Sequence, residues 1–262
     1  MSAERWMLVN AVEKEETRIA VVRDGRLEDL HVERTSHETL VGNIYKGRVE
    51  NVHPGLQAAF VDIGLEKNAF LHVSETVGEG EEPYHHPQRG RPPRGPKRLI
   101  QNLLRPGQEA IVQVIRDPFG EKGPSVSMEV SLPGRFLVLT PLTTKVGVSK
   151  KITQPQQRAQ LRQLMRQLTQ ETPSNVGFIV RTASGDTTAQ DLKNDFEYLQ
   201  RVWNAVDQRA KPARAPASLY QETELVQRTV RDFFSPDIAR VIVDDPGVHQ
   251  RLCEFFDHVM PR

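Results

Sequence analysis

Two phenylalanines, Phe60 and Phe70, are the residues whose type and spacing first suggest a chemistry. They lie in 43–75, where short runs of β-branched and aromatic residues, separated by turns, predict a strongly bent antiparallel sheet. Aromatic side chains on neighbouring strands can stack on the bases of single-stranded nucleic acid. The basic residues that could flank them are Lys46, Arg48 and Lys67. Side-chain alternation equally allows both phenylalanines to be core residues of a small barrel.

Arg181 and Thr182 form a second candidate site. They end the apolar strand that is predicted over 177–182, and a polar turn follows them. At such a strand end, a guanidinium can bind a phosphate through two parallel hydrogen bonds, and a threonine hydroxyl can add one more donor. The alternative is that Arg181 is a surface arginine that pairs with an acidic side chain.

The adjacent carboxylates Asp244 and Asp245 suggest a metal site, because carboxylates at strand ends can hold Mg²⁺. We reject this interpretation because neighbouring residues on a strand point to opposite faces, and Asp-Asp-Pro-Gly is an ordinary turn sequence. The single cysteine, Cys253, excludes an internal disulfide and a multi-cysteine zinc site. We therefore predict no catalytic residue and no metal ligand in this chain.

Composition limits the classes of function. The 262 residues are 37% hydrophobic and 26% charged, which is typical of a soluble globular protein with one large domain or a few small ones. A formal net charge of +1 means that any nucleic-acid binding must come from local patches of charge. No apolar run approaches the roughly 20 residues that span a bilayer, and the N-terminus has no signal-peptide pattern. We expect a cytoplasmic protein.

The two ends of the chain are predicted to complete one domain. The N-terminal strands form an antiparallel meander with a hairpin at Asp24-Gly25, and this sheet has no helix of its own to cover it. A C-terminal helix, strand and helix are the expected partner. The predicted elements are strands 6–12, 16–23 and 27–34, helix 221–234, strand 239–244 and helix 248–260.

The middle of the chain contains two further predicted domains. The first continues the sheet of 43–75 with strands 108–116 and 125–132, on either side of a Pro- and Gly-rich loop at 77–98 and the turn 117–123. That loop could steer a phosphate backbone, or it could equally be a solvated insertion. Its basic residues are Arg89, Arg91, Arg94, Lys97 and Arg98. The second has predicted strands at 131–141, 145–152 and 177–182, helices at 154–170 and 189–208, and an extended linker at 211–218.

Several motifs carry a resemblance to a known family. G-R-V-x-x-V-x-x-G-x-x-A-A-F-V-D-I-G, at 47–64, resembles the OB-fold RNA-binding domain named after ribosomal protein S-one. Together with I-Y-K-G before it, M-L-V-N at 7–10 and V-R-T-A at 180–183, the chain is similar to the ribonuclease E/G family of bacterial endoribonucleases. The likeness extends from Trp6 to about Pro246.

The resemblance implies an α+β multidomain fold. Residues 1–36 and 217–262 would form a ribonuclease-H-like domain in two segments, which in this family is structural rather than catalytic. Residues 37–128 would be the OB-fold barrel of the S-one type, and 129–216 an α/β 5′-sensor subdomain. The ribonuclease-H-like domain would thus be interrupted by the two others.

The resemblance also implies binding residues. Phe60 and Phe70 would line an RNA groove together with Lys122, which matches the family's K-G turn; otherwise Lys122 is a solvent-exposed turn lysine. V-R-T-A resembles the motif that recognises the 5′-monophosphate of RNA, so Arg181 and Thr182 would contact that phosphate. The residues at the other matching positions of this pocket are Gly134, Val138, Lys150 and Lys151.

Two features separate this chain from the family pattern. Lys150 and Lys151 stand where the family commonly has two arginines, and lysine lacks the planar fork, so selectivity for the monophosphate would be looser. The chain also ends where the DNase-I-like catalytic domain of the family would begin. Mg²⁺, a structural Zn²⁺ held by a C-x-x-C link, and homo-oligomerisation would then belong to the full-length protein, and this chain alone is expected to be inactive.

The function that the resemblance implies is RNA recognition within an endoribonuclease of RNA processing and decay. The complete enzyme would cleave single-stranded RNA, not DNA, with a magnesium-activated water. The alternative is a stand-alone, non-catalytic protein that binds single-stranded RNA.

Overall fold

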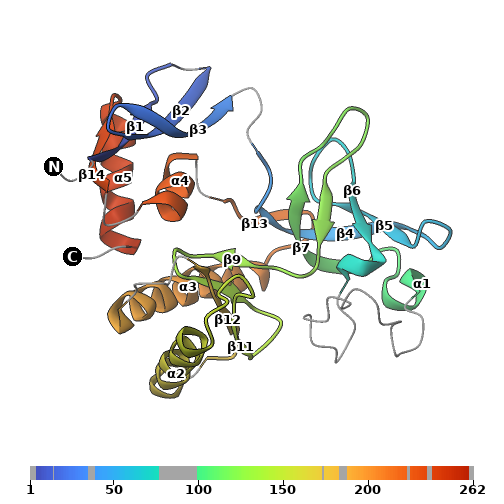
Figure 1. Ribbon diagram of the computed structural model, residues 1–262. Coiled ribbons are helices and arrows are strands. Elements are labelled where there is room, and N and C mark those ends of the chain that lie inside the picture. The colour runs from blue at the N-terminus through green and yellow to red at the C-terminus, as the bar shows by residue number, and fades with distance from the viewer. Residues whose placement is uncertain are drawn as a thin grey trace. The chain divides into compact units, whose positions relative to one another are not determined.

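The computed structural model describes residues 4–13, 15–34, 39–76, 99–172, 174–182, 188–222, 225–234 and 238–259. The chain divides into two compact units, an end unit made of 1–39 with 223–262, and a middle unit made of 40–222 (Figure 1). The basic loop predicted at 77–98, with Arg89, Arg91, Arg94, Lys97 and Arg98, lies entirely outside the described residues.

The end unit joins the two ends of the chain in one sheet. Its strand order is β14-β1-β2-β3, and β14 pairs parallel with β1, with Met7 opposite Val241. Figure 1 shows the blue N-terminal strands beside the red C-terminal strand and helix. The elements are β1 (Arg5–Asn10), β2 (Glu16–Arg23), β3 (Arg26–Arg34), α4 (Leu225–Phe233), β14 (Ile238–Val243) and α5 (Pro246–Val259). The prediction that the C-terminal segment completes the N-terminal meander is confirmed.

One face of this sheet is covered by helices. Met7 and Ile19 are fully buried, whereas Leu8, the neighbour of Met7, is 36% exposed, so side chains alternate between core and solvent. Val230 of α4 and Leu252 of α5 are buried as well. The predicted hairpin is also present: Asp24 and Gly25 have φ of 49° and 76°, the positive values that a two-residue turn of this kind requires.

Strand β13 (Ala217–Tyr220) belongs to the middle unit, which differs from the domain boundary expected at 217. It pairs antiparallel with β4 (Ile44–His53), with Ala217 opposite Lys46. The same residues of β4 pair with β7 on their other edge, so β13 satisfies backbone groups that would otherwise be exposed. The predicted helix 221–234 correspondingly begins only at Leu225.

A closed five-stranded barrel forms the first part of the middle unit. Its strands run in the order β4-β5-β6-β8-β7, and β7 closes the barrel by pairing with β4. Fully buried Val49, Val61, Leu71 and Val112 fill its interior. The remaining elements are β5 (Ala58–Asp62), β6 (Ala69–His72), η2 (Val73–Glu75), α1 (Ile100–Leu103), β7 (Glu109–Arg116) and β8 (Ser125–Ser127). The barrel expected from the sequence is present.

A four-stranded sheet with two helices forms the second part of the middle unit. The strand order is β11-β12-β10-β9, and Leu161 and Phe196 from the helices share one buried cluster with Leu139 and Phe178 from the strands. The apolar stripe of the second helix is part of this core. The elements are β9 (Leu132–Pro133), β10 (Leu137–Thr140), β11 (Val146–Val148), α2 (Pro155–Glu171), β12 (Gly177–Val180) and α3 (Ala189–Ala210).

Gln113 of β7 connects the barrel to the start of this sheet. Its amide oxygen accepts the N–H of Ser131, and its amide nitrogen donates to the carbonyl oxygens of Ser131 and Gly42, each over 2.9 Å. Because the side chain is buried, all of these hydrogen bonds are shielded from water.

Candidate nucleic-acid interface

Phe60 and Phe70 are cross-strand neighbours on the barrel. They stand directly opposite each other in the β5–β6 ladder, and their ring centroids lie 5.9 Å apart at an interplanar angle of 70°. Both rings are half-buried, and both lie outside the buried cluster to which their sequence neighbours Ala59, Val61, Ala69 and Leu71 belong. Alternation therefore turns the two rings to the face opposite the barrel core, where an aromatic surface is accessible.

Two histidines extend this pair, and the sequence analysis did not single them out. His53 lies 5.3 Å from Phe60 with the rings perpendicular at 87°, and His72 lies 6.4 Å from Phe70 with the rings near parallel at 24°. His72 could have been found from its position two residues after Phe70 on the same strand. His53 could not, because its place beside Phe60 depends on the register of β4 against β5.

The basic residues near the phenylalanines in sequence have other partners. Lys46 donates to the carbonyl oxygens of Ala210 and Ala213 and lies 3.0 Å from a carboxylate oxygen of Glu109. Its hydrogen bond to Glu109 is the main reason that the pKa of that carboxyl is lowered. Arg48 donates to the carbonyl oxygen of Ala215 over 2.8 Å. Lys46 and Arg48 thus hold the end of α3 and the chain that follows it against β4.

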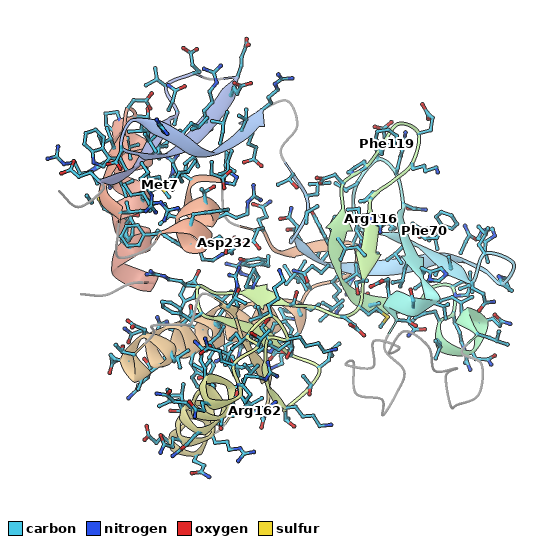
Figure 2. The ribbon with its side chains drawn as sticks, viewed as in Figure 1. Met7, Phe70, Arg116, Phe119, Arg162 and Asp232 are labelled. Atoms are coloured by element: carbon cyan, nitrogen blue, oxygen red, sulfur yellow. The ribbon has the colours of Figure 1, made fainter. Side chains whose placement is uncertain are left out.

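Lys122 lies in the exposed turn between β7 and β8. It exchanges two backbone hydrogen bonds with Phe119, a ring that is 85% exposed. The turn is held beside the start of β6, because Phe70 N–H donates to the carbonyl of Pro124 and Lys67 contacts Gly120 and Glu121. Figure 2 shows Phe119 at the far end of this turn and Phe70 on the strand below.

A second cluster forms at one edge of the β9–β12 sheet. Strands β11 and β12 are parallel, with Val148 opposite Val180, so the residues that follow them leave the sheet at the same edge. Strand β10 runs antiparallel to β12 and begins there, with Leu137 opposite Val180. The structure therefore brings together what we call the strand-end cluster: Gly134, Lys150, Lys151, Arg181 and Thr182. Val138 stands apart from the cluster, inside β10 and opposite Ile179.

Arg181 is half-buried and bound to backbone. Its guanidinium donates to the carbonyl oxygen of Gly134, and its own N–H donates to the carbonyl of Phe136 over 2.7 Å. Lys150, Lys151 and Thr182 are exposed. The cluster thus combines a positioned guanidinium with accessible ammonium and hydroxyl groups, a combination of donors that suits an anion.

Asp195 fixes the backbone at this edge of the sheet through hydrogen bonds. It projects from α3, is 1% exposed, and accepts the backbone N–H groups of Arg135, Phe136 and Leu137 over 3.1, 2.8 and 2.8 Å. Burial raises the pKa of Asp195, while these donors and the charge of Arg181 act in the opposite direction. In the sequence, the only sign of this role is that Asp195 is a lone acidic residue within the apolar stripe of α3.

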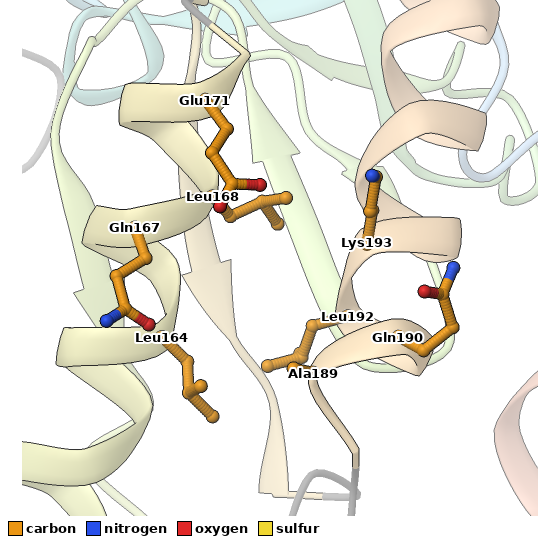
Figure 3. Close-up of a pocket in the computed structure, with 8 residues that line it drawn as sticks. All are labelled: Leu164, Gln167, Leu168, Glu171, Ala189, Gln190, Leu192 and Lys193. Carbon is orange, nitrogen blue, oxygen red and sulfur yellow. The ribbon is translucent and has the colours of Figure 1, made fainter.

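A cavity of about 250 Å³ lies between α2 and α3 (Figure 3). No residue of the aromatic pair or the strand-end cluster lines it. Its lining residues are Leu164, Gln167, Leu168, Glu171, Ala189, Gln190, Leu192 and Lys193.

The carboxylates of Asp244 and Asp245 both bind backbone groups in the end unit. Asp244 accepts the N–H of Ala11 over 2.7 Å and the amide of Asn10 over 2.5 Å, and the bond from Ala11 is the main reason that its pKa is lowered. Asp245 accepts the N–H of Val248 at the start of α5 over 2.7 Å. Across the described residues, no three His, Cys, Asp or Glu side chains are grouped to hold a metal ion.

None of the described helices is long and apolar enough to cross a membrane.

Comparison with known proteins supplies the family. Ribonuclease G of Salmonella typhimurium (strain SL1344) and of Escherichia coli (strain K12) are each 40% identical to this chain over 261 residues, which is 100% of this chain and 51% of theirs. Ribonuclease E of Haemophilus influenzae is 36% identical over 255 residues, covering 97% of this chain and 26% of that protein. The chain therefore spans about half the length of the ribonuclease G relatives.

Among solved structures, a chain of the a/eIF2alpha-aDim2p-rRNA complex from Pyrococcus horikoshii OT3 aligns at 15% identity over 68% of this chain and 89% of that chain, but with a TM-score of only 0.25. That similarity is too low to support an assignment. The model of the Ribonuclease E/G family, in contrast, matches residues 131–262, half of the sequence. This chain belongs to the ribonuclease E/G family.

Proposed function

We propose that this chain is the RNA-recognition part of an endoribonuclease that acts on single-stranded RNA in RNA processing and decay. Within it, the barrel holds unpaired bases through Phe60, Phe70 and Lys122, and the strand-end cluster recognises a 5′-monophosphate. The end unit, in this proposal, is a ribonuclease-H-like domain with a structural role. The site of action is the cytoplasm.

The observation that carries the proposal is the position of Phe60 and Phe70. The two large aromatic rings pair across strands, lie outside the core of their own barrel and are partly exposed. Base stacking on such rings tolerates any sequence, because every base has a π-face. The relatives named ribonuclease G and ribonuclease E act on RNA by name, which supports RNA as the ligand.

The strand-end cluster supports the second part of the proposal. A 5′-monophosphate offers doubly charged terminal oxygens, whereas a 5′-hydroxyl offers none. Arg181, fixed by Gly134, can bind these oxygens, with Thr182 as a further donor and Lys150 and Lys151 as nearby positive charges. The proposal also includes Val138, which follows Leu137 at the start of β10.

Cleavage itself is assigned to the complete protein. The family resemblance implies hydrolysis by a water that Mg²⁺ activates, a structural Zn²⁺ and assembly into homo-oligomers, and we propose that these belong to sequence beyond the half that this chain shares with its relatives. We propose that residues 1–262 alone bind RNA and do not cleave it.

One binding experiment tests both parts. A short unstructured RNA is prepared with either a 5′-monophosphate or a 5′-hydroxyl, and its affinity is measured by fluorescence anisotropy for the wild type, for Phe60→Ala with Phe70→Ala, and for Arg181→Ala. Loss of the phenylalanines should weaken the binding of both RNAs by about 1–3 kcal/mol per base that is no longer stacked. Arg181→Ala should remove the preference for the monophosphate and leave the affinity for the hydroxyl form nearly unchanged.

Leu56→Ala is the matched control, because Leu56 is an apolar residue, 59% exposed, on the same barrel and has no aromatic face. Circular dichroism verifies that each variant is folded. Equal affinity of the wild type for both RNAs would reject the 5′-monophosphate site. Unchanged affinity of the folded phenylalanine variant would reject the barrel as the RNA-binding surface.

A further inference from the structure

We propose that one exposed side of α2 binds the phosphate backbone of single-stranded RNA and leads it away from the strand-end cluster. This surface is the arginine row, which consists of Arg158, Arg162 and Arg166. The inference rests on the proposed function of the strand-end cluster. It adds to that function a binding surface for the nucleotides that follow the 5′ end.

The segment 131–170 contains no acidic residue, although the whole chain has a formal net charge of only +1. It includes strands β9, β10 and β11 and nearly all of α2. The basic residues of this segment are Arg135, Lys145, Lys150, Lys151, Arg158, Arg162 and Arg166. Charge of a single sign, concentrated in one part of a nearly neutral chain, gives a local positive field that attracts a polyanion.

The arginine row follows from the spacing of its members. Residues four apart on a helix are neighbours, separated by a rise of about 6 Å, so Arg158, Arg162 and Arg166 lie along one side of α2. Arg158 is half-buried, and Arg162 and Arg166 are exposed (Arg162 is labelled in Figure 2). The buried residues of α2 are Leu161, Met165 and Leu168. The row therefore lies beside the buried face of the helix and is open to solvent.

The one acidic residue of α2 lies on another side of the helix. Glu171 is at its C-terminal end and lines the cavity between α2 and α3, together with Leu164 and Leu168 (Figure 3). Within the part of the chain that the structure describes, no carboxylate pairs with Arg162 or Arg166. These two guanidinium groups are thus accessible to an anion from solvent.

Arg158 connects the row to the strand-end cluster. Its guanidinium donates to the carbonyl oxygens of Ser149 and Ile152 over 2.6 and 2.8 Å. These two residues stand on either side of Lys150 and Lys151, so the turn that carries the lysines is fixed against the first turns of α2. A strand whose 5′ end lies at the lysines therefore reaches the next arginine of the row about 6 Å further along the helix.

RNA fits the arginine row better than a lipid surface does. An amphipathic helix binds a bilayer by burying its apolar face at the boundary with the acyl chains. The apolar face of α2 is already part of the core, where Leu161 is 4% and Met165 0% exposed. Guanidinium groups, in contrast, bind phosphate oxygens in pairs and need no apolar contact.

The test uses substitutions that change charge and preserve the helix. Arg162→Gln and Arg166→Gln, singly and together, remove positive charge, and glutamine has a helix propensity close to that of arginine. Replacing both residues by lysine keeps the charge and is the rescue variant. Arg201→Gln is the matched control, because it removes one exposed arginine from α3.

Affinity is measured by fluorescence anisotropy at several salt concentrations, with 5′-monophosphorylated RNA about 10 nucleotides long and with a 5′-monophosphorylated dinucleotide. All variants also carry Phe60→Ala and Phe70→Ala, so that the barrel contributes little. Each glutamine substitution in the row should lower the slope of log K against log salt by about 0.7, which is about a fivefold loss of affinity for the longer RNA at 0.1 M salt and none at 1 M. The dinucleotide, Arg201→Gln and the lysine variant should show no such loss.

The outcomes separate this inference from the proposed function. If the double glutamine variant binds the longer RNA with the affinity and salt slope of Arg201→Gln, the row does not bind RNA and the inference is wrong, while a monophosphate preference that Arg181→Ala removes still supports the proposed site. Equal affinity of the wild type for 5′-monophosphate and 5′-hydroxyl RNA rejects that site, and with it the path from the 5′ end.

Two further results would overturn the inference. An equal loss for the dinucleotide and the longer RNA, or a loss that lysine does not restore, would show that the substitutions disturb the cluster or the packing of α2. Vesicles of phosphatidylserine and phosphatidylcholine provide the other arm. If they bind the wild type but not the double glutamine variant, and RNA affinity is unchanged, the row binds lipid head groups instead of RNA.

Discussion

Gly134 and Asp195 are in such close contact that a side chain at position 134 would displace the carboxylate of Asp195. A Cβ atom on Gly134 would lie 2.5 Å from each carboxylate oxygen of Asp195. This approach lets Asp195 bind the three backbone N–H groups of 135–137, and it leaves the carbonyl of Gly134 directed at Arg181. Those N–H groups are therefore not donors for an anion, so in the proposed 5′-monophosphate site the side chains of the strand-end cluster would be the donors.

Asp195→Asn should destabilise the middle unit and reduce the proposed 5′-monophosphate preference. Asparagine has one acceptor oxygen, so it cannot satisfy the N–H groups that Asp195 binds with both oxygens, and a buried unsatisfied donor costs about 1–3 kcal/mol. Urea unfolding gives the loss of free energy, and the two-RNA competition gives the preference. Glu197→Gln, a half-buried change on the same helix, is the control. Unaltered stability and preference would mean that Asp195 does not position the cluster.

The difference in stability between the wild type and Asp195→Asn should depend on pH. Burial raises the pKa of Asp195 in the folded protein above its value in the unfolded chain. A raised pKa means that the folded state holds its proton more tightly, so the contribution of Asp195 to stability is largest below about pH 4 and falls as the pH rises through the folded value. The free energy of unfolding of the wild type relative to Asp195→Asn should therefore decrease with rising pH. A difference that grows with pH would contradict the direction of this shift.

The two lysines of the strand-end cluster should limit selectivity. Replacing both Lys150 and Lys151 by arginine supplies planar forks that can bind phosphate oxygens in pairs, and we expect a stronger preference for the 5′-monophosphate. Replacing both by glutamine removes the charge and should weaken the binding of the monophosphorylated RNA by about 1 kcal/mol, because both side chains are exposed. Identical preferences in the wild type and in both variants would place the lysines outside the site.

Much of this architecture could be predicted from the sequence, because local patterns determine it. The alternation around Phe60 and Phe70 predicted the strands, and the turn at Asp24-Gly25 predicted the hairpin. The alternation did not decide whether the two rings are core or surface, because that depends on barrel closure between β4 and β7. Strand β13 was missed for a related reason: four residues after a Pro-rich linker have no period of their own, and only the free edge of β4 makes them a strand.

The roles of charged residues were the least predictable. Lys46 and Arg48 stand near Phe60 in sequence, yet their side chains bind the carbonyls of the chain after α3, more than 160 residues away in sequence. Asp195 is likewise defined by residues about 60 positions earlier. Contacts of this kind depend on the assembled fold, and neither periodicity nor local motif encodes them.

Lys46→Met should therefore reduce stability without changing how RNA binding depends on salt. Lys46 contacts Glu109 and two backbone carbonyls, so its loss breaks a connection between β4 and the chain after α3. A lysine that bound a phosphate would, when removed, reduce the slope of log K against log salt concentration by about 1. Measuring that slope for wild type and variant distinguishes the two roles. A reduced slope with unchanged stability would assign Lys46 to the RNA-binding surface after all.

Asp244 should act as a structural acceptor and not as a metal ligand. The N–H of Ala11 lowers its pKa in the folded state, so the stabilisation that it provides is present above the unfolded value near pH 4 and is lost as the pH falls through the lower folded value. Asp244→Ala should lower the melting temperature at neutral pH and have little effect at the acid end. Asp245→Asn is the matched comparison, and it should be nearly neutral because asparagine caps helices as well as aspartate does.

Mg²⁺ provides the contrasting test of this carboxylate pair. An ion that binds only the folded state raises its stability in proportion to the logarithm of its concentration. Since Asp244 and Asp245 direct their carboxylates at Ala11 and Val248, we expect the melting temperature to be the same with and without added Mg²⁺. Stabilisation by Mg²⁺ that disappears in Asp244→Ala, together with RNA cleavage that the same substitution abolishes, would show that the pair is a catalytic metal site.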